Sequence, residues 1–167
     1  MGAKTLIVVS HGEYDREAGK MTRDGIEGIK NLSQKLRPFV VGPVKILSSP
    51  VLYAAHAAAM LALVYKKSRV AYDTSFHLWA PDVFDPPAFL PAIGEVRRLC
   101  QRSNEGTVIV VTHNVYTGAI PDEVARYFRR PEDSLGPEVF PLLGRAEAYV
   151  LHLNDHEFTR VKGKEDE

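Results

Sequence analysis

Short runs of apolar residues alternate with longer segments of helical periodicity along the chain. Residues 5–10, 44–47 and 107–112 are rich in Val, Ile and Leu and end at polar residues, which is typical of strands buried on both faces. A shorter strand is predicted over residues 69–72. Helices are predicted over residues 26–36, 51–65, 88 or 92 to 102, and 116–129. This alternation predicts an α/β fold, a three-layer α/β/α sandwich with a mostly parallel sheet.

Cap and turn residues indicate where these elements begin and end. Thr22 is a candidate cap for the first helix, and Pro38 is expected to end that helix. Three segments are interpreted as loops because they are polar or rich in proline: residues 11–23, 76–91 and 131–143.

The end of the chain has the pattern of a β-hairpin. Residues 147–153 and 156–161 read as strands on either side of Asn154-Asp155. We expect a single domain over residues 1–161, followed by a charged, frayed tail over residues 162–167.

Composition narrows the classes of partner. The chain has 167 residues, with 21 basic and 21 acidic ones, so its formal net charge is zero. This balance gives no overall attraction to nucleic acid or to a membrane surface. No apolar stretch approaches the ~20 residues of a membrane span, and the first residues lead into a strand without a secretory leader. We therefore expect a cytoplasmic protein, in which the single Cys100 forms no internal disulfide and is buried as a small apolar residue.

Two histidines stand at the ends of predicted central strands. His11 follows residues 5–10, and His113 follows residues 107–112. Ligands of an open α/β sheet bind at the carboxyl ends of its strands, so the two histidines form a candidate catalytic pair. Four segments are expected to meet there: residues 10–13, 48–50, 73–82 and 112–114.

Other catalytic and binding classes lack their motifs. The Gly-x-Ser-x-Gly turn of a serine hydrolase and the Gly-x-Gly-x-x-Gly turn of a dinucleotide-binding fold are absent from the sequence. His152 and His156 flank a predicted turn, where their spacing does not create a helical zinc site.

Four sequence elements carry a family resemblance. They are His11-Gly12 after the first strand, Met21-Thr22-Arg23-Asp24-Gly25, Leu47-Ser48-Ser49-Pro50-Val51-Leu52, and Thr112-His113-Asn114 after the Val-rich strand. In this order they resemble the histidine phosphatase superfamily, also called phosphoglycerate mutase-like, over roughly residues 4–153. In size the chain is similar to the small phosphohistidine phosphatases. The resemblance implies that the strands ending at His11 and His113 are neighbours, and that the strand at 147–153 is antiparallel.

The resemblance also implies roles for individual residues. His11 would be the nucleophile that becomes phosphorylated, and His113 would bind and stabilise the transferring phosphoryl group. Gly12 lets the backbone approach the phosphate closely, and Asn114 is expected beside it. No metal and no cofactor is implied.

The general acid for the leaving group is left open among three carboxylates. Asp82 is preferred, and Glu13 and Asp73 are the alternatives.

Two positions depart from the family pattern. Ser10 and Tyr53 stand where the family has arginines that bind the phosphoryl oxygens. They remain candidate phosphate-binding residues, because their hydroxyls can donate hydrogen bonds, but they bring no charge. Each hydrogen bond to a charged group contributes roughly 1.5–3 kcal/mol, so two missing arginines correspond to on the order of 3–6 kcal/mol in binding or rate. His56, one helical turn after Tyr53, could restore positive charge when protonated. Further candidates for phosphate contacts are Arg16, Lys20, Arg23, His77 and Arg145.

Two hypotheses for function follow. In the first, the protein hydrolyses a phosphorylated small molecule or a phosphoprotein through a phosphohistidine at His11. In the second, it is a catalytically degenerate relative that binds a ligand or a protein through the same cleft. The sequence does not indicate the substrate or the oligomeric state.

Overall fold

A six-stranded sheet forms the centre of the molecule in the computed structural model, which describes residues 2–65, 68–76, 86–128, 140–155 and 157–164. The strand order is β5-β4-β6-β1-β7-β8. The strands are β1 (Thr5–Ser10), β4 (Val44–Ser48), β5 (Arg69–Tyr72), β6 (Thr107–Thr112), β7 (Glu147–His152) and β8 (Glu157–Lys162). A separate two-stranded ribbon is formed by β2 (Tyr14–Asp15) and β3 (Lys20–Met21).

Strand β1 lies in the middle of the sheet and is buried along its whole length. It pairs in parallel with β6, from Thr5 opposite Thr107 to Ser10 opposite Thr112. On its other side it pairs antiparallel with β7, and β7 pairs antiparallel with β8. The predicted adjacency of β1 and β6, the antiparallel late strand and the terminal hairpin are therefore confirmed.

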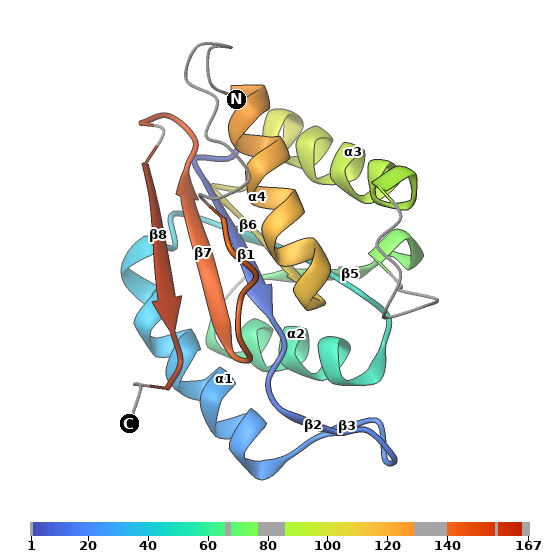
Figure 1. Cartoon of the computed structure of the whole chain (residues 1–167). Helices are drawn as coiled ribbons and strands as arrows, with labels where there is room; N and C mark the ends of the chain where they lie inside the picture. Colours follow the sequence, from blue (N-terminus) through green and yellow to red (C-terminus); the bar gives the residue numbers. More distant parts are fainter. Residues whose placement is uncertain (1, 66–67, 77–85, 129–139, 156, 165–167) are drawn as a thin grey trace.

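In the described part of the chain, four helices cover the two faces of the sheet (Figure 1). They are α1 (Arg23–Leu36), α2 (Leu52–Val64), α3 (Pro86–Arg102) and α4 (Asn114–Phe128). Short 3-10 turns follow α1 and β5, at η1 (Arg37–Phe39) and η2 (Thr74–Phe76). The predicted three-layer α/β/α sandwich with a mostly parallel sheet is confirmed.

The alternation of side chains along β1 divides the core into two layers. Leu6 and Val8 point to the side of α3 and α4, where they join one buried cluster. Ile7 and Val9 point to the side of α1 and α2 and join the other. Because both faces of the strand are covered, its sequence is continuously apolar.

The predicted helix limits hold better at α1 and α2 than at α3. Thr22 caps α1, since its side chain accepts a hydrogen bond from the backbone N–H of Gly25. The interpretation of residues 76–91 as a loop is wrong for its last part, because α3 already begins at Pro86. Prolines suit a first helical turn, where backbone N–H groups need no helical partner. Residues 77–85 and 129–139 lie outside the described part of the chain.

Two other segments are more ordered than expected. The polar loop over residues 11–23 contains the β2–β3 ribbon, with Gly19 at a φ of 63° in its turn. At the other end of the chain, Lys162 belongs to β8 and the backbone N–H of Gly163 donates to the carbonyl of Ala146. The expectation of fraying from residue 162 onward is therefore wrong for these residues. Residues 165–167 lie outside the described part.

Cys100 is buried in α3, as expected, and its burial raises the pKa of the thiol to about 12. Among the described residues, no helix has the length and apolar character required to cross a bilayer.

Two glycines allow the segment after β1 to lie against the start of α1. A Cβ atom on Gly25 would lie 2.1 Å from the carbonyl oxygen of Glu13, and one on Gly12 would lie 2.4 Å from the carbonyl oxygen of Gly25. Only glycine permits this approach of two backbones. The contact fixes the position of residues 11–13.

We predict that Gly25→Ala lowers the free energy of unfolding by about 1–3 kcal/mol, because the added methyl group collides with backbone atoms. Gly94→Ala is the matched control, since Gly94 is exposed in α3 and no atom lies within 4 Å of the place its Cβ would take. That change should raise the free energy of unfolding by about 0.5–1 kcal/mol. Urea unfolding measures both, and equal effects of the two substitutions would contradict the close-approach argument.

Candidate active site

The two histidines predicted to form a pair lie side by side at the carboxyl ends of β1 and β6. Ser10 pairs with Thr112 in the sheet, so the residues that follow them leave the sheet at the same level. The rings of His11 and His113 lie with centroids 5.6 Å apart and an interplanar angle of 64°. Both are almost fully buried, with 5% of His11 and 6% of His113 exposed.

The position and protonation of His11 are set by its own backbone. Its Nδ1 lies 2.8 Å from the carbonyl oxygen of Gly12. A carbonyl only accepts, so Nδ1 carries the hydrogen and the lone pair of the neutral ring is on Nε2. Burial lowers the pKa of His11 from 6.5, the hydrogen bond to Gly12 opposes this, and the positive charge of Arg145 lowers the pKa further. His11 is therefore a neutral imidazole at pH 7.

His113 is oriented by the segment after β4. Its Nε2 lies 3.0 Å from Oγ of Ser49. The same Ser49 hydroxyl oxygen accepts a hydrogen bond from the backbone N–H of Val51 at 3.3 Å. The Ser-Ser-Pro element thus contributes a side chain to the site. Its presence in the family resemblance was the signal that pointed to this segment, although Ser49 itself was not among the predicted site residues.

Two tyrosine rings lie against His11. Tyr53, on the first turn of α2, has its ring centroid 4.4 Å from that of His11 and 5.5 Å from that of His113. Tyr14, on β2, lies 5.1 Å from His11 and stacks on Tyr53 at 4.1 Å with an interplanar angle of 18°. Burial, the negative potential of Tyr14 and a hydrogen bond to Tyr14 raise the pKa of Tyr53 to about 12. Tyr53 is therefore neutral at pH 7 and brings no charge to the site.

Tyr14 was missed from the sequence. A lone tyrosine in a polar segment carries no distinguishing pattern, and its contact with Tyr53 depends on how the β2–β3 ribbon folds over the end of β1.

Ser10, the other residue that stands in place of a family arginine, is fully buried at the end of β1.

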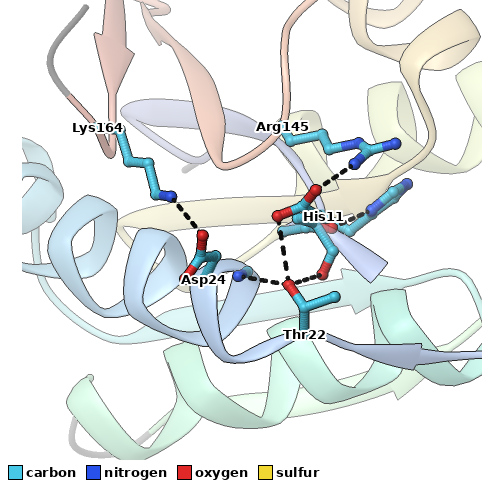
Figure 2. A network of polar contacts seen from close by, with 8 residues as sticks. His11, Thr22, Asp24, Arg145 and Lys164 are labelled. Atoms are coloured by element: carbon cyan, nitrogen blue, oxygen red, sulfur yellow. Dashed lines mark hydrogen bonds and ion pairs between the residues drawn. The ribbon is translucent and has the colours of Figure 1, made fainter. Parts of the chain in front are cut away.

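An ion pair connects two distant segments beside His11. Nη1 of Arg145 lies 3.1 Å from Oε1 of Glu13, and both side chains are about half exposed, 44% and 46%. Oε2 of Glu13 lies 3.4 Å from the hydroxyl of Thr22. Figure 2 shows Arg145, His11 and Thr22 converging from the loop before β7, the end of β1 and the start of α1. Among the described residues that were predicted as further candidates for phosphate contacts, Arg145 therefore takes part in the network beside His11.

The other candidate site residues are exposed, hydrogen-bonded within another element, or outside the described part of the chain. His56 is exposed on α2, and Arg16, Lys20 and Arg23 are exposed on the ribbon and at the start of α1. Oδ1 of Asp73 accepts a hydrogen bond from the backbone N–H of Ser75 at 2.8 Å, within η2. Asp82 and His77 lie outside the described residues, as does the side chain of Asn114 at the start of α4.

The geometry suits nucleophilic chemistry by an imidazole. A neutral His11 with its lone pair on Nε2 is held beside a second histidine in surroundings that exclude much of the water. Among the described residues, no three His, Cys, Asp or Glu side chains are grouped so that they could hold a metal ion.

Comparison with solved structures identifies the fold. A candidate phosphohistidine phosphatase SixA from Nakamurella multipartitia superposes with a TM-score of 0.67 at 19% identity, covering 90% of this chain and 85% of that one. A protein histidine phosphatase SixA in complex with tungstate gives a TM-score of 0.69 at 14% identity, covering 95% and 97%. A mycobacterial glucosyl-3-phosphoglycerate phosphatase in complex with VO3 gives 0.62 at 16% identity, covering 96% and 97%.

No model of a protein family matches the chain, and no curated protein matches it significantly in sequence. At these low identities the structural likeness concerns the fold. The chain has the histidine phosphatase fold, and the resemblance inferred from its four sequence elements is confirmed at that level.

We predict that His11 titrates below 6.5, the value from which its pKa is lowered, and that Arg145→Met moves this pKa upward because a nearby positive charge is removed. Titration of the imidazole resonances by NMR checks both. A pKa at or above 6.5 in the wild type would contradict the argument.

The same shift predicts a dependence of stability on pH. Because the pKa of His11 is depressed in the folded state, its contribution to stability is present above pH 6.5 and is lost as the pH falls through the folded-state pKa. The free energy of unfolding of the wild type should therefore fall more steeply than that of His11→Gln between about pH 7 and 5. Parallel profiles in denaturant unfolding would contradict it.

Proposed function

We propose that this protein hydrolyses a phosphorylated substrate by way of a phosphohistidine at His11. One observation carries the proposal: His11 is a buried, neutral imidazole whose Nδ1–H is held by the Gly12 carbonyl at 2.8 Å, so its nucleophilic Nε2 is defined before substrate binds. The histidine phosphatase fold supports the same chemistry.

The reaction takes place in two steps. In the first, the lone pair on Nε2 of His11 attacks phosphorus, the bond from phosphorus to the leaving group breaks, and the leaving group departs with the electron pair and receives a proton from an acid. In the second, water attacks phosphorus and gives a proton to the conjugate base of that acid, the P–N bond breaks with its electron pair returning to Nε2, and inorganic phosphate leaves the neutral imidazole.

The other residues support these steps. His113 lies close enough to His11 to hydrogen-bond the phosphoryl oxygens, and Ser49 fixes its ring orientation. Asp82 remains our proposal for the general acid. Among the described carboxylates, Glu13 is the alternative that lies in the network beside His11.

The substrate class proposed is a phosphoprotein, including phosphohistidine, or a small phosphate ester. Solved relatives of the same fold are described as acting on phosphohistidine and on glucosyl-3-phosphoglycerate, which supports both kinds. The balanced charge of the chain supports a substrate other than nucleic acid or membrane lipid and is compatible with the cytoplasm as the site of action.

A second candidate function is binding without turnover. It is favoured by the Tyr14–Tyr53 stack, which packs neutral rings against His11 at a position where the family has an arginine. In that case the site around His11 would bind a ligand or a partner protein. Tyr53→Arg should then create phosphatase activity that the wild type lacks.

We predict that the wild type releases phosphate from a phosphohistidine peptide or from a generic aryl phosphate, and that His11→Ala releases none above buffer. His113→Ala should bind substrate more weakly and lose about 100-fold or more in rate, as is typical when a group that stabilises developing charge is removed. A colorimetric phosphate assay measures release.

Arg98→Met is the control, because Arg98 pairs with Glu95 on the exposed surface of α3. Its activity should equal that of the wild type. Release by His11→Ala at the wild-type rate would contradict the proposed function.

A further inference from the structure

We propose that Arg145 binds the phosphoryl oxygens in place of the two missing arginines, and that Glu13 holds its guanidinium until substrate arrives. The inference rests on the proposed function and adds to it a phosphate-binding residue from a separate part of the chain. Arg145 precedes β7, far in sequence from His11 and from the start of α2.

The backbone places Arg145 directly beside the nucleophile. The N–H of the next residue, Ala146, donates to the carbonyl of His11 at 3.0 Å, and the carbonyl of Ala146 accepts from the N–H of Gly163 at 2.8 Å. Ala146 has a φ of 54°, which is uncommon for a residue with a side chain. Such conformations persist where surrounding contacts enforce them and are concentrated at functional sites. The turn therefore holds Arg145 at the site at the expense of local strain.

The side chain of Arg145 extends over Tyr14, one of the tyrosine rings that lie against His11. Its Cζ lies 5.5 Å from the centroid of Tyr14, and the ring of His11 lies 5.1 Å from the same centroid. In Figure 2 the guanidinium group of Arg145 lies on the same side of the view as His11. Its charge is close enough to lower the pKa of His11. Arg145 thus supplies, beside Tyr14, the positive charge that Tyr53 lacks.

The present partner of Arg145 is one that a phosphate can displace. An ion pair between two half-exposed side chains contributes little, because water solvates both charges well. A guanidinium binds a phosphoryl group through two parallel charge-assisted hydrogen bonds, which is a stronger arrangement. Exchange of Glu13 for phosphate is therefore favourable. The negative charge of Glu13 also repels a phosphate bound beside it, so it lowers the affinity of the site for phosphate.

Other described cations near the site are less suited. Lys164 lies 3.5 Å from Asp24 and is directed to the start of α1. Lys20 is exposed on the ribbon, one position before the end of β3. Neither has a backbone contact to His11 comparable with that of the Arg145 turn.

The test is the affinity for inorganic phosphate, measured by isothermal titration calorimetry on the full chain at pH 7. Arg145→Met should weaken binding at least tenfold, and Arg145→Lys should recover part of it, because lysine keeps the charge but not the paired hydrogen bonds. Glu13→Gln should tighten binding severalfold, since it frees Arg145 and removes a negative charge. Arg98→Met should bind as the wild type does.

Arg145→Met and Glu13→Gln are expected to change the affinity for phosphate in opposite directions, which distinguishes phosphate binding by Arg145 from a purely structural role of the ion pair. If the ion pair only stabilised the fold, Arg145→Met and Glu13→Gln would weaken binding together, and that result would overturn the proposal. Unchanged affinity in Arg145→Met, or no phosphate binding by the wild type, would overturn it as well. The proposed function is tested separately, by phosphate release that depends on His11. If Arg145→Met keeps both this release and the wild-type affinity for phosphate, only the role of Arg145 is rejected.

Discussion

The parallel pairing of β1 with β6 is the constraint on which the site depends. The register brings Ser10 opposite Thr112, so the chain leaves both strands at one level and the next residues are the two histidines. Both strands are buried on each face, which makes this register costly to shift, because a slip by one residue would exchange the side chains of the two core layers. The geometry of the histidine pair is therefore a consequence of the core.

The protonation state of His11 follows from the same arrangement. The tight contact of residues 12 and 13 with Gly25 orients the Gly12 carbonyl toward Nδ1. Burial then disfavours the imidazolium form. The backbone contact and the burial both point to one chemical state, a neutral imidazole. Two uncharged tyrosine rings lie against His11, and the nearby positive charge that lowers its pKa is that of Arg145.

Much of the fold could be predicted from the sequence because its central strands are short and apolar and its first helix begins at a capping threonine. Thr22 and the Ser-Ser-Pro element lie where their patterns indicated. Errors occurred where local signals conflict with tertiary structure. The prolines before residue 92 suggested a loop, whereas they begin α3. At the site, His11 and His113 were found from their place at strand ends. Tyr14, Ser49 and the Arg145–Glu13 pair depend on contacts between segments far apart in sequence, which no local pattern reports.

The proposed hydrolysis requires that His11 carry the phosphoryl group. Rapid mixing with a phosphorylated substrate, quenching in alkali and mass analysis of the peptides test it directly, because phosphohistidine survives alkali. We expect one added phosphoryl group on the peptide that contains His11, forming and decaying within a single turnover. Phosphate release without any labelled peptide, or a label on a residue other than His11, would contradict it.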